Sequence, residues 1–580
     1  MSPLLAVLSL ALAQSDDPNR LCYLDGNDPY YVHGSFARLT TPQWVGEEGV
    51  EAVIVLAIDD MRGHEKWEAY LRPILERLKK IDGRAPVSIM TCKIDPKHEH
   101  LQKWLQEGLS LEVHTIDHPC PLLKDGDFAK AKSTVERCID QMAEVPSSRP
   151  VAFRMPCCDS LNTPSPRFWA EIFNATTAKG NFLTMDSSVF NITTPKDKAL
   201  PRELVVDADG REKFRKYLPF PSFVNTIEDY PYPYVIARLC WELPCAVPSD
   251  WEAQNIHKVT NPQKLPSVPA DARSIADMKA AIDVTVAKKG VFNFVYHPYN
   301  WILPSQVIEL IDHTVEKHGR KVKFLNFREV QERIDANLLM GQPLRTPEGK
   351  DNGVRLVDVD NDGYLDVLVA NPKLRATRVW APALRSWTRL EMPAERLDTG
   401  ARFGVVRKDG QATLLTASGA WHFDRTGWVE AVGMTTNVSL ASARLRDIDK
   451  DGLCELIARK DVHSWSGKAW DKRPFTLPVP VTDYDRGLRF VDLDGDGKDD
   501  IIFSNEDTWS VHRFVSPETG WEKLSGGKRG DPGEVPIIVR GGMDNGAWFH
   551  SGHLWVQNED TAKMKDLVDR RSFVDLLKKP

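Results

Sequence analysis

The sequence predicts two folded parts, an α/β part built on a parallel sheet and an all-β part built from repeats. Over the first 340 residues, apolar strands alternate with amphipathic helices, which is typical of a parallel sheet covered by helices. Carboxylate, imidazole and guanidinium side chains follow the ends of several of these strands, as in barrels of the (β/α) kind. From about residue 340 the helical periodicity stops and an acidic motif recurs.

The composition is that of an ordinary globular protein. At 580 residues the chain is long enough for more than one domain, each with its own core. Hydrophobic residues make up 42% of the chain and charged residues 27%, both usual values. The net charge of -7 does not indicate a nucleic-acid-binding protein, because such proteins usually carry a basic surface. No apolar run of about 18 residues follows the N-terminal segment, so we expect no membrane span.

Residues 1–15 are expected to be a secretory signal peptide. An apolar segment ends in Ala11-Leu12-Ala13, a small-x-small cleavage pattern, and polar residues follow from Gln14. The alternative is a buried N-terminal strand. A secreted, periplasmic or cell-surface protein can hold disulfides, and eight of the nine cysteines lie in the first half of the chain. The odd count leaves at least one thiol unpaired within the chain, and the pairing does not follow from the sequence.

Hydrophobic periodicity places the elements of the α/β part. Strands are expected over residues 53–58, 87–91, 111–113, 151–153, 291–296 and 322–325. Helices are expected over residues 66–80, 99–107, 128–143, 305–318 and 327–339. The stretch 193–269, rich in proline and aromatic residues, is expected to form loops around the site. Its rings between residues 230 and 251 would offer stacking surfaces beside the cleft.

The residues able to carry chemistry stand where these strands end. Asp59 and Asp60 follow the first strand, and His114 and His118 follow the third. Two imidazoles at that spacing can reach one metal ion, and a carboxylate completes a three-ligand site with open positions for water and substrate. Three further strand ends carry Arg154, Asp186 and His297.

Taken in order, these residues resemble the motifs of the polysaccharide deacetylases, the metal-dependent enzymes of carbohydrate esterase family four. The resemblance covers roughly residues 45–335. The family's first motif, Thr-Phe-Asp-Asp-Gly, corresponds to residues 57–61 and its second, His-Ser/Thr-x-x-His, to residues 114–118. The third, Arg-x-Pro-Tyr, corresponds to residues 154–157, and the fifth, Leu-x-His, to residues 295–297. The fourth motif carries an aspartate that is similar to Asp186.

The resemblance implies a distorted (β/α) barrel of the polysaccharide deacetylase type over residues 16–340, and a role for each residue. A divalent metal, expected to be zinc, would be bound by Asp60, His114 and His118. Asp59 would be the general base, oriented by Arg154 and Asp186, and His297 the general acid that protonates the departing amine. The backbone N–H of Cys157 would stabilise the oxyanion.

The preferred hypothesis is the removal of N-acetyl groups from an acetylated polysaccharide outside the cytoplasm. An O-acetyl esterase acting on xylan-like polymers is an alternative, because the same site can serve an ester. The alternative from another class is a glycan-binding or adhesion protein without catalysis. Its support is that Met61 stands in place of the family's glycine and Cys157 in place of its tyrosine.

Residues 341–580 are expected to form an all-β, propeller-like repeat domain. The motif D-x-D-x-D-G-x-x-[DE] occurs three times, and its copies begin at Asp358, Asp447 and Asp492. The second and third copies start 45 residues apart and the first two 89 apart, so one unit of about 45 residues fits. A degenerate copy at 401–416 fills the gap, and 537–552 looks like a fifth copy. Five units are few for a closed ring, and whether they close one stays open.

The acidic loops resemble the start of calcium-binding EF-hand loops, and they are similar to the FG-GAP/VCBS-type repeats of integrin-like propellers. Carboxylates at the first, third and fifth positions, with glycine at the sixth, wrap oxygens around a hard cation. The calcium ligands so implied are Asp358, Asp360, Asp362, Asp366, Asp447, Asp449, Asp451, Glu455, Asp492, Asp494, Asp496 and Asp500. The alternative is an acidic turn without an ion. A glycan or a protein would be the further ligand of the repeats.

The N-terminal segment generates a first testable prediction. If residues 1–15 are removed on export, N-terminal sequencing of the exported protein should find a mature start near Gln14. Exported protein that still begins with Met1 would contradict the signal-peptide interpretation.

Overall fold

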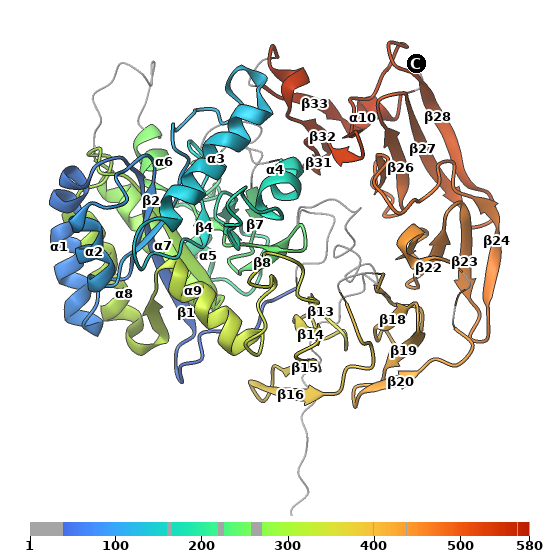
Figure 1. Ribbon diagram of the computed structural model, residues 1–580, viewed down its shortest axis with the longest axis horizontal. Helices are drawn as coiled ribbons and strands as arrows, with labels where there is room; N and C mark the ends of the chain where they lie inside the picture. The colour runs from blue at the N-terminus through green and yellow to red at the C-terminus, as the bar shows by residue number, and fades with distance from the viewer. Residues whose placement is uncertain are drawn as a thin grey trace, which may run out of the picture.

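The computed structural model describes residues 39–578 apart from 159–164, 219–225, 257–268, 398–399, 435, 437 and 565–566. The expected signal peptide therefore lies outside the described residues. A mostly parallel, 12-stranded sheet is followed in the chain by a succession of antiparallel sheets (Figure 1). Among the described helices, none combines the length and the apolar character that a membrane span needs.

The centre of the large sheet is β1 (Ala52–Met61), whose residues are all buried. It pairs in parallel with β11 (Val291–Tyr296) on one side and with β2 (Val87–Thr91) on the other. Beyond β2 follow β3 (Ser110–Val113) and β4 (Ala152–Phe153), again in parallel. A continuous apolar strand such as β1 is typical of a sheet covered on both faces. Because these strands are parallel, their carboxyl ends meet at one edge of the sheet.

The sheet curls but does not close into a barrel. Its order is β7-β6-β10-β11-β1-β2-β3-β4-β5-β9-β8, and β12 also pairs with β1. The outer strands are β5 (Met185–Asp186), β6 (Phe190–Ile192), β7 (Thr226–Glu228), β8 (Tyr234–Ile236), β9 (Cys240–Glu242), β10 (Cys245–Ala246) and β12 (Val322–Phe324). Within the described ranges the edge strands β7 and β8 do not pair with each other. The distorted barrel expected from the sequence is therefore an open, curled sheet.

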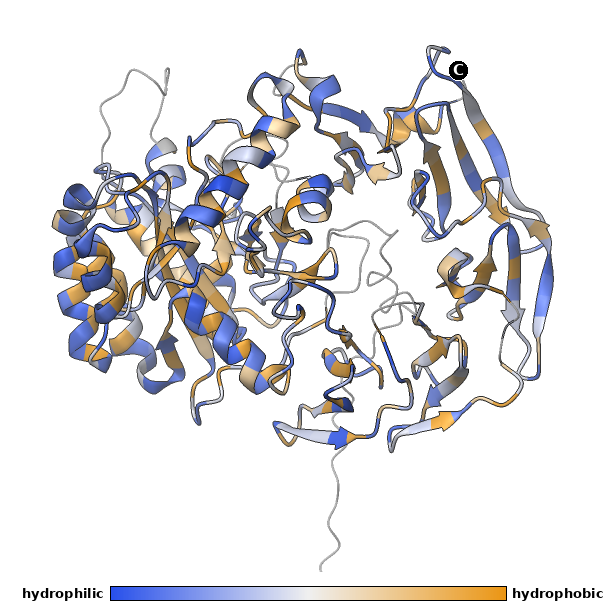
Figure 2. Cartoon of the chain, in the orientation of Figure 1, coloured by the Kyte–Doolittle hydropathy of each residue, from blue (hydrophilic) through white to orange (hydrophobic). Residues whose placement is uncertain are grey.

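Amphipathic helices cover the faces of this sheet. The longer ones are α1 (His64–Asp82), α2 (Glu99–Glu107), α3 (Phe128–Ala143), α7 (Ala272–Ala287), α8 (Pro304–His318) and α9 (Phe327–Arg333). The short ones are α4 (Pro166–Phe168), α5 (Arg202–Val205) and α6 (Asp250–Asn255), whereas α10 (Phe573–Leu576) follows the last antiparallel sheet of the chain. Helix α1 buries Trp67 and Leu71 on one face and ends at Gly83, whose φ of 71° suits glycine. Apolar residues accordingly concentrate on the strands and on the inner helix faces (Figure 2).

The stretch 193–269 differs from the loops predicted for it. Its described residues supply strands β7 to β10 to the sheet, together with the short helices α5 and α6. The rings expected to line the cleft pack instead in the core, where Tyr230, Tyr234 and Trp241 are all buried. Strands of two or three residues are too short for alternation to reveal them, which explains the difference.

The second part of the chain begins with two four-stranded antiparallel sheets. The first comprises β13 (Val354–Val357), β14 (Asp366–Ala370), β15 (Arg375–Ala381) and β16 (Ser386–Leu390). The second comprises β17 (Arg402–Gly404), β18 (Thr413–Thr416), β19 (Gly419–Phe423) and β20 (Trp428–Glu430). The degenerate copy expected at 401–416 is thus part of a complete four-stranded sheet, although it lacks the acidic loop of the first.

Two more four-stranded sheets and two smaller ones follow. The third sheet comprises β21 (Ala443–Arg446), β22 (Glu455–Ala458), β23 (Asp461–Trp465) and β24 (Trp470–Thr476). The fourth sheet comprises β25 (Leu488–Val491), β26 (Asp500–Ser504), β27 (Thr508–Ser516) and β28 (Gly520–Lys528). The small sheets comprise β29 (Val539–Arg540) with β30 (Met543–Asp544), and β31 (Ala547–His550) with β32 (His553–Val556) and β33 (Asp569–Ser572). The fifth copy expected at 537–552 falls in these small sheets.

The antiparallel sheets follow one another around an arc, and both ends of the arc contact the α/β part (Figure 1). At the first end, Leu356 of β13 packs in one hydrophobic core with residues of β1 and α9. At the other end, Trp548 and Trp555 belong to the main core of the α/β part. There Arg167 also forms an ion pair of 2.7 Å with Glu559. The α/β part therefore lies between the first and the last sheet.

This shared core generates a stability prediction. Trp548 is 1% exposed, so Trp548→Ala should lower the free energy of unfolding by about 3–5 kcal/mol, as for other buried tryptophans. Val574 is 67% exposed, and Val574→Ala should change it by less than about 0.5 kcal/mol. Urea unfolding followed by fluorescence measures both. Equal effects of the two variants would contradict the docking of the last sheet on the α/β part.

Candidate active site

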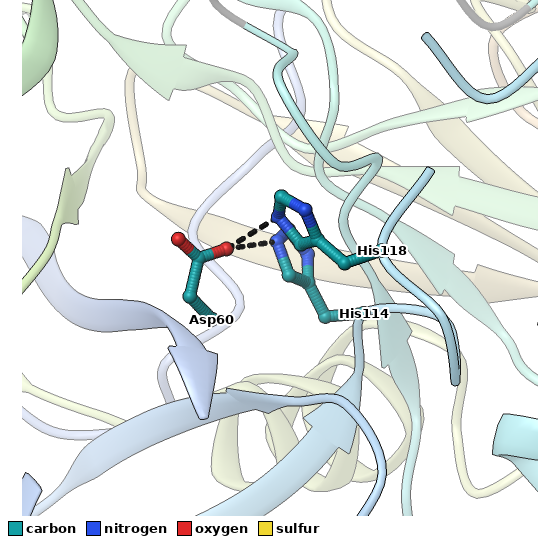
Figure 3. Close-up of side chains that lie close together, drawn as sticks. All are labelled: Asp60, His114 and His118. Atoms are coloured by element: carbon teal, nitrogen blue, oxygen red, sulfur yellow. Dashed lines mark hydrogen bonds and ion pairs between the residues drawn. The ribbon is translucent and has the colours of Figure 1, made fainter. Parts of the chain in front are cut away.

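The three residues predicted to bind a metal lie together at the carboxyl edge of the large sheet (Figure 3). Asp60 stands near the end of β1, and His114 and His118 follow β3. Nε2 of His114 is 3.1 Å from Oδ1 of Asp60, and Nε2 of His118 is 2.5 Å from the same oxygen. One carboxylate and two imidazoles that converge on one point form a donor set which zinc-class ions bind. The residues present therefore fit a divalent metal ion.

The surroundings of these side chains prepare them for that role. Nδ1 of His114 is 2.8 Å from the backbone oxygen of Arg154. Donation of Nδ1–H to this carbonyl leaves the lone pair of Nε2 for a metal. Burial alone would raise the pKa of Asp60, but the imidazoles of His114 and His118 and the charge of His297 hold it well below its ordinary value. Asp60 therefore stays ionised.

Local backbone conformations turn these side chains toward one another. The pairing of β1 with β2 shifts between Ile58 and Met61, which marks a bulge at the two aspartates. Asp60 and His118 both have positive φ, 69° and 52°. Such φ values are uncommon outside glycine and cluster at functional sites. Met61, which replaces the family's glycine, is fully buried in the core, so its side chain is accommodated by packing.

Asp59 is held by Arg154, as predicted. Nη1 of Arg154 donates to Oδ1 of Asp59 at 2.8 Å, and both side chains are buried. The rest of the guanidinium donates to Ser187 O at 3.1 Å, to Ser187 Oγ at 3.0 Å and to Asn293 Oδ1 at 3.1 Å. A buried guanidinium bonded on all sides keeps a fixed position. The orientation of Asp59 is therefore set by an immobile partner.

Asp186, which was predicted to orient Asp59, lies close enough to Arg154 to interact with its charge. Its carboxylate accepts a hydrogen bond from Ser188 Oγ at 2.7 Å and lies beside Glu242. Burial raises the pKa of Asp186 to about 6. Its next residue, Ser187, is the one that contacts Arg154. Ser187 is thus the residue of this segment that hydrogen-bonds to Arg154, and the orienting role of Asp186 stays a prediction.

His297 has a partner that the sequence analysis missed, Asp250. Nδ1 of His297 is 2.9 Å from Oδ1 of Asp250, and the His297 backbone N–H donates to Oδ2 at 2.7 Å. Burial opposes the protonation of His297, but the charges of Asp250, Asp60 and Asp59 outweigh it and raise its pKa to about 10. A protonated imidazole can donate through Nε2, which lies 4.0 Å from Oδ2 of Asp59.

Asp250 is the first residue of α6 and belongs to the stretch that we expected to form loops. Ser249 caps the helix and Glu252 bonds back to it. Ser-x-x-Glu is a capping-box pattern, and it could have located this helix from the sequence.

Two aromatic residues beside His297 were also missed. The ring of Trp301 lies 4.7 Å from that of His297 and 5.3 Å from that of Tyr299, measured between centroids. Nζ of Lys66 lies 3.8 Å from the centroid of Tyr299. Both rings are partly exposed, unlike those of Tyr230 and Tyr234. The aromatic surface next to the site therefore follows β11, and rings of this kind can stack on a sugar.

Cys157, whose backbone N–H was predicted to stabilise an oxyanion, forms a disulfide with Cys120. The bond joins the loop that follows His118 to the loop that follows Arg154. Cys157 has a φ of 56°, a further strained position at this edge of the sheet. The other described cysteines are buried, and Cys22 lies outside the described residues. The role of the Cys157 N–H stays a prediction.

Comparisons with known proteins bear on this part of the chain. Residues 46–164 match the family model described as "Polysaccharide deacetylase", which supports a polysaccharide deacetylase domain there. A search of curated proteins found no match.

Similar solved structures include a putative polysaccharide deacetylase from Mycobacterium smegmatis, with 14% identity, 51% of this chain and 95% of that chain covered, and a TM-score of 0.32. A second is the catalytic domain of a peptidoglycan N-acetylglucosamine deacetylase from Eubacterium rectale, which is 11% identical. The match covers 47% of this chain and 88% of that chain, with a TM-score of 0.24. A third is a family 4 carbohydrate esterase from Streptomyces lividans in complex with acetate, which is 10% identical. The match covers 47% of this chain and 91% of that chain, with a TM-score of 0.22.

The contact between Asp250 and His297 generates a prediction on pH dependence. Because Asp250 stabilises the imidazolium, Asp250→Asn should lower the pKa of His297. An acid with a lower pKa loses its proton at lower pH. The alkaline limb of the plot of kcat against pH, measured on an acetylated glycan, should therefore move to lower pH. Asp186→Asn is the matched control and should leave that limb in place. If the alkaline limb moves in Asp186→Asn but not in Asp250→Asn, then Asp250 is not the carboxylate that raises the pKa of His297.

Proposed function

We propose that this protein is a metal-dependent hydrolase that removes N-acetyl groups from a polysaccharide outside the cytoplasm. The observation that carries the proposal is the combination of a buried carboxylate held by an arginine, a histidine held by a carboxylate, and a carboxylate–imidazole–imidazole cluster at one sheet edge. Metal-assisted hydrolysis of an amide uses a base, an acid and a metal in these roles. The match of residues 46–164 to the polysaccharide deacetylases supports the same reaction class.

The base side of the site consists of Asp59 and its partner Arg154. When bound by Asp60, His114 and His118, a divalent ion acidifies water and polarises an acetyl carbonyl. Asp59 is placed to take the proton of the attacking water. Since Arg154 occupies Oδ1 of Asp59, Oδ2 is the oxygen left to accept that proton.

The acid side of the site consists of His297 and Asp250. An amine leaves poorly without a proton, so cleavage of an N-acetyl group requires an acid near the nitrogen. Asp250 fixes Nδ1–H of His297, which directs Nε2–H toward the substrate. Nε2 of His297 lies 4.0 Å from Oδ2 of Asp59, so both groups would reach the same acetyl group. After transfer, His297 is neutral and Asp59 carries the water proton.

Two features support a substrate outside the cytoplasm. Cys120 is exposed, so its disulfide with Cys157 meets solvent, and such bonds persist in oxidising compartments. The apolar segment before Gln14 supplies a route of export. Polymeric glycans lie in that location, and Tyr299 and Trp301 provide rings on which a sugar can stack.

We further propose that the three acidic loops of the repeats bind calcium. In each loop the first, third and ninth side chains lie together, and these sets are Asp358, Asp360 and Asp366; Asp447, Asp449 and Glu455; and Asp492, Asp494 and Asp500. In the third loop, burial and the neighbouring carboxylates of Asp494 and Asp496 raise the pKa of Asp500 to about 7. A cation would relieve this repulsion. The fifth side chains, Asp362, Asp451 and Asp496, bond instead to backbone N–H groups two residues on.

Two variants test the catalytic proposal, because one should keep the bound metal ion and the other should lose it. Asp59→Asn should keep the metal but lower kcat by about 10²–10⁴-fold, because it removes the base. His118→Ala should lose turnover and the ion held by Asp60 and His114, because it removes a ligand. Metal content is measured by atomic spectroscopy and turnover by acetate release, with Asp95→Asn, at an exposed loop acid, as the control. Full turnover in Asp59→Asn, or full metal content in His118→Ala, would refute these roles.

The second acidic loop differs from the other two, and this generates a calcium prediction. Nη2 of Arg473 lies 3.1 Å from Oε1 of Glu455 and 3.3 Å from Oδ2 of Asp449, so a guanidinium already neutralises these carboxylates. Calcium should therefore raise the Tm through the first and third loops, and Asp358→Ala should reduce this rise more than Asp447→Ala. Equal Tm values in millimolar calcium and in chelator would identify all three as acidic turns.

A further inference from the structure

A second group of one carboxylate and two imidazoles lies on helices α7 and α8, apart from the site described above. Asp283 belongs to α7, and His313 and His318 belong to α8. Nε2 of His313 is 2.9 Å and Nε2 of His318 is 2.7 Å from the same oxygen, Oδ1 of Asp283. Sequence analysis did not single out this group, because its members lie within helices and on no strand end.

The second group repeats the donor chemistry and the dimensions of the first. In both, two Nε2 atoms approach one carboxylate oxygen, at 3.1 and 2.5 Å in the first and at 2.9 and 2.7 Å in the second. The rings of His313 and His318 are nearly perpendicular, at 82°, so they are not stacked on each other beside the carboxylate. Asp283 is buried, whereas the side chains of His313 and His318 are 19% and 12% exposed, so water reaches the group from the side of the two histidines.

Lys317 contacts the other oxygen of the same carboxylate. Its Nζ lies 2.8 Å from Oδ2 of Asp283, so Oδ1 remains for the two imidazoles. The Lys317 side chain is 53% exposed, and it can turn into solvent at little cost. Its charge opposes the binding of a cation, which makes this site weaker than that of Asp60.

Hydrogen bonds alone give a competing account of this group. Two neutral imidazoles could each donate Nε2–H to Asp283 and so hold α8 against α7 without an ion. A metal instead requires the lone pair of each Nε2, with the proton on Nδ1. The two accounts predict different effects of a side chain that donates a hydrogen bond but binds metals poorly. The substitution His313→Gln introduces such a side chain.

We propose that Asp283, His313 and His318 form a second site for a zinc-class divalent ion, which links α8 to α7. Two imidazoles and one carboxylate suit zinc, cobalt or copper better than calcium or magnesium. The chain then carries two sites of this class with unequal affinity. The second one acts on stability, because an ion that binds only the folded protein stabilises it.

The test counts zinc ions on the full-length protein. Each protein is stripped with chelator, kept in millimolar calcium to fill the acidic loops, and dialysed against micromolar zinc. The wild type should bind two zinc ions, His313→Gln one and His118→Ala one, and the double variant none. Zinc should raise the Tm of His118→Ala but not that of the double variant. Lys317→Met should tighten zinc binding to His118→Ala by about fivefold, the usual worth of one exposed charge pair.

Two results would overturn the proposal. One is an unchanged zinc count in His313→Gln, and the other is a His118→Ala variant that binds no zinc. If His313→Gln fails to fold, His318→Gln gives the same count. A Tm that falls in His313→Gln equally with and without zinc would favour the hydrogen-bond account.

Discussion

The buried ion pair between Arg154 and Asp59 is the interaction on which the site depends. Arg154 follows β4 and Asp59 belongs to β1, three strands away in the sheet order. In a flat sheet that separation would be about 14 Å, which is longer than an arginine side chain. For the observed contact of 2.8 Å, both side chains must therefore reach toward each other across β2 and β3, and the curl of the sheet shortens the distance that they span.

The cost of burying this pair explains the polar groups around it. A buried charge is tolerated only when it is paired and hydrogen-bonded, and removal of one partner costs about 3–5 kcal/mol. Ser187 and Asn293 complete the shell of Arg154; Ser187 directly follows β5, and Asn293 lies within β11. The same guanidinium thus links three strands beside the cluster of Asp60, His114 and His118. His297, which follows β11, is positioned by the same arrangement and by Asp250.

The sequence was sufficient for the elements with strong periodicity. Helices α2 and α3 and strands β2 and β11 have the bounds that periodicity predicted, because each is long enough for its apolar pattern to be read. The cluster of Asp60, His114 and His118 was also predictable, since parallel strands bring their carboxyl ends together. Asp250, Tyr299 and Trp301 were not, because each depends on short elements or on loop geometry that leaves no periodic signal. The arrangement of the repeats around the α/β part is likewise a tertiary property, decided by cores that Leu356 and Trp548 share with distant strands.

The central claim is that this edge of the sheet performs deacetylation. Acetate release by the metal-loaded full-length protein, measured on N-acetylglucosamine oligomers, peptidoglycan and acetylated xylan, tests it most directly. The account predicts acetate from an N-acetylated substrate. Acetate from xylan alone would identify an O-acetyl esterase. A metal-loaded protein that releases no acetate from any of them would contradict the account and favour a glycan-binding protein.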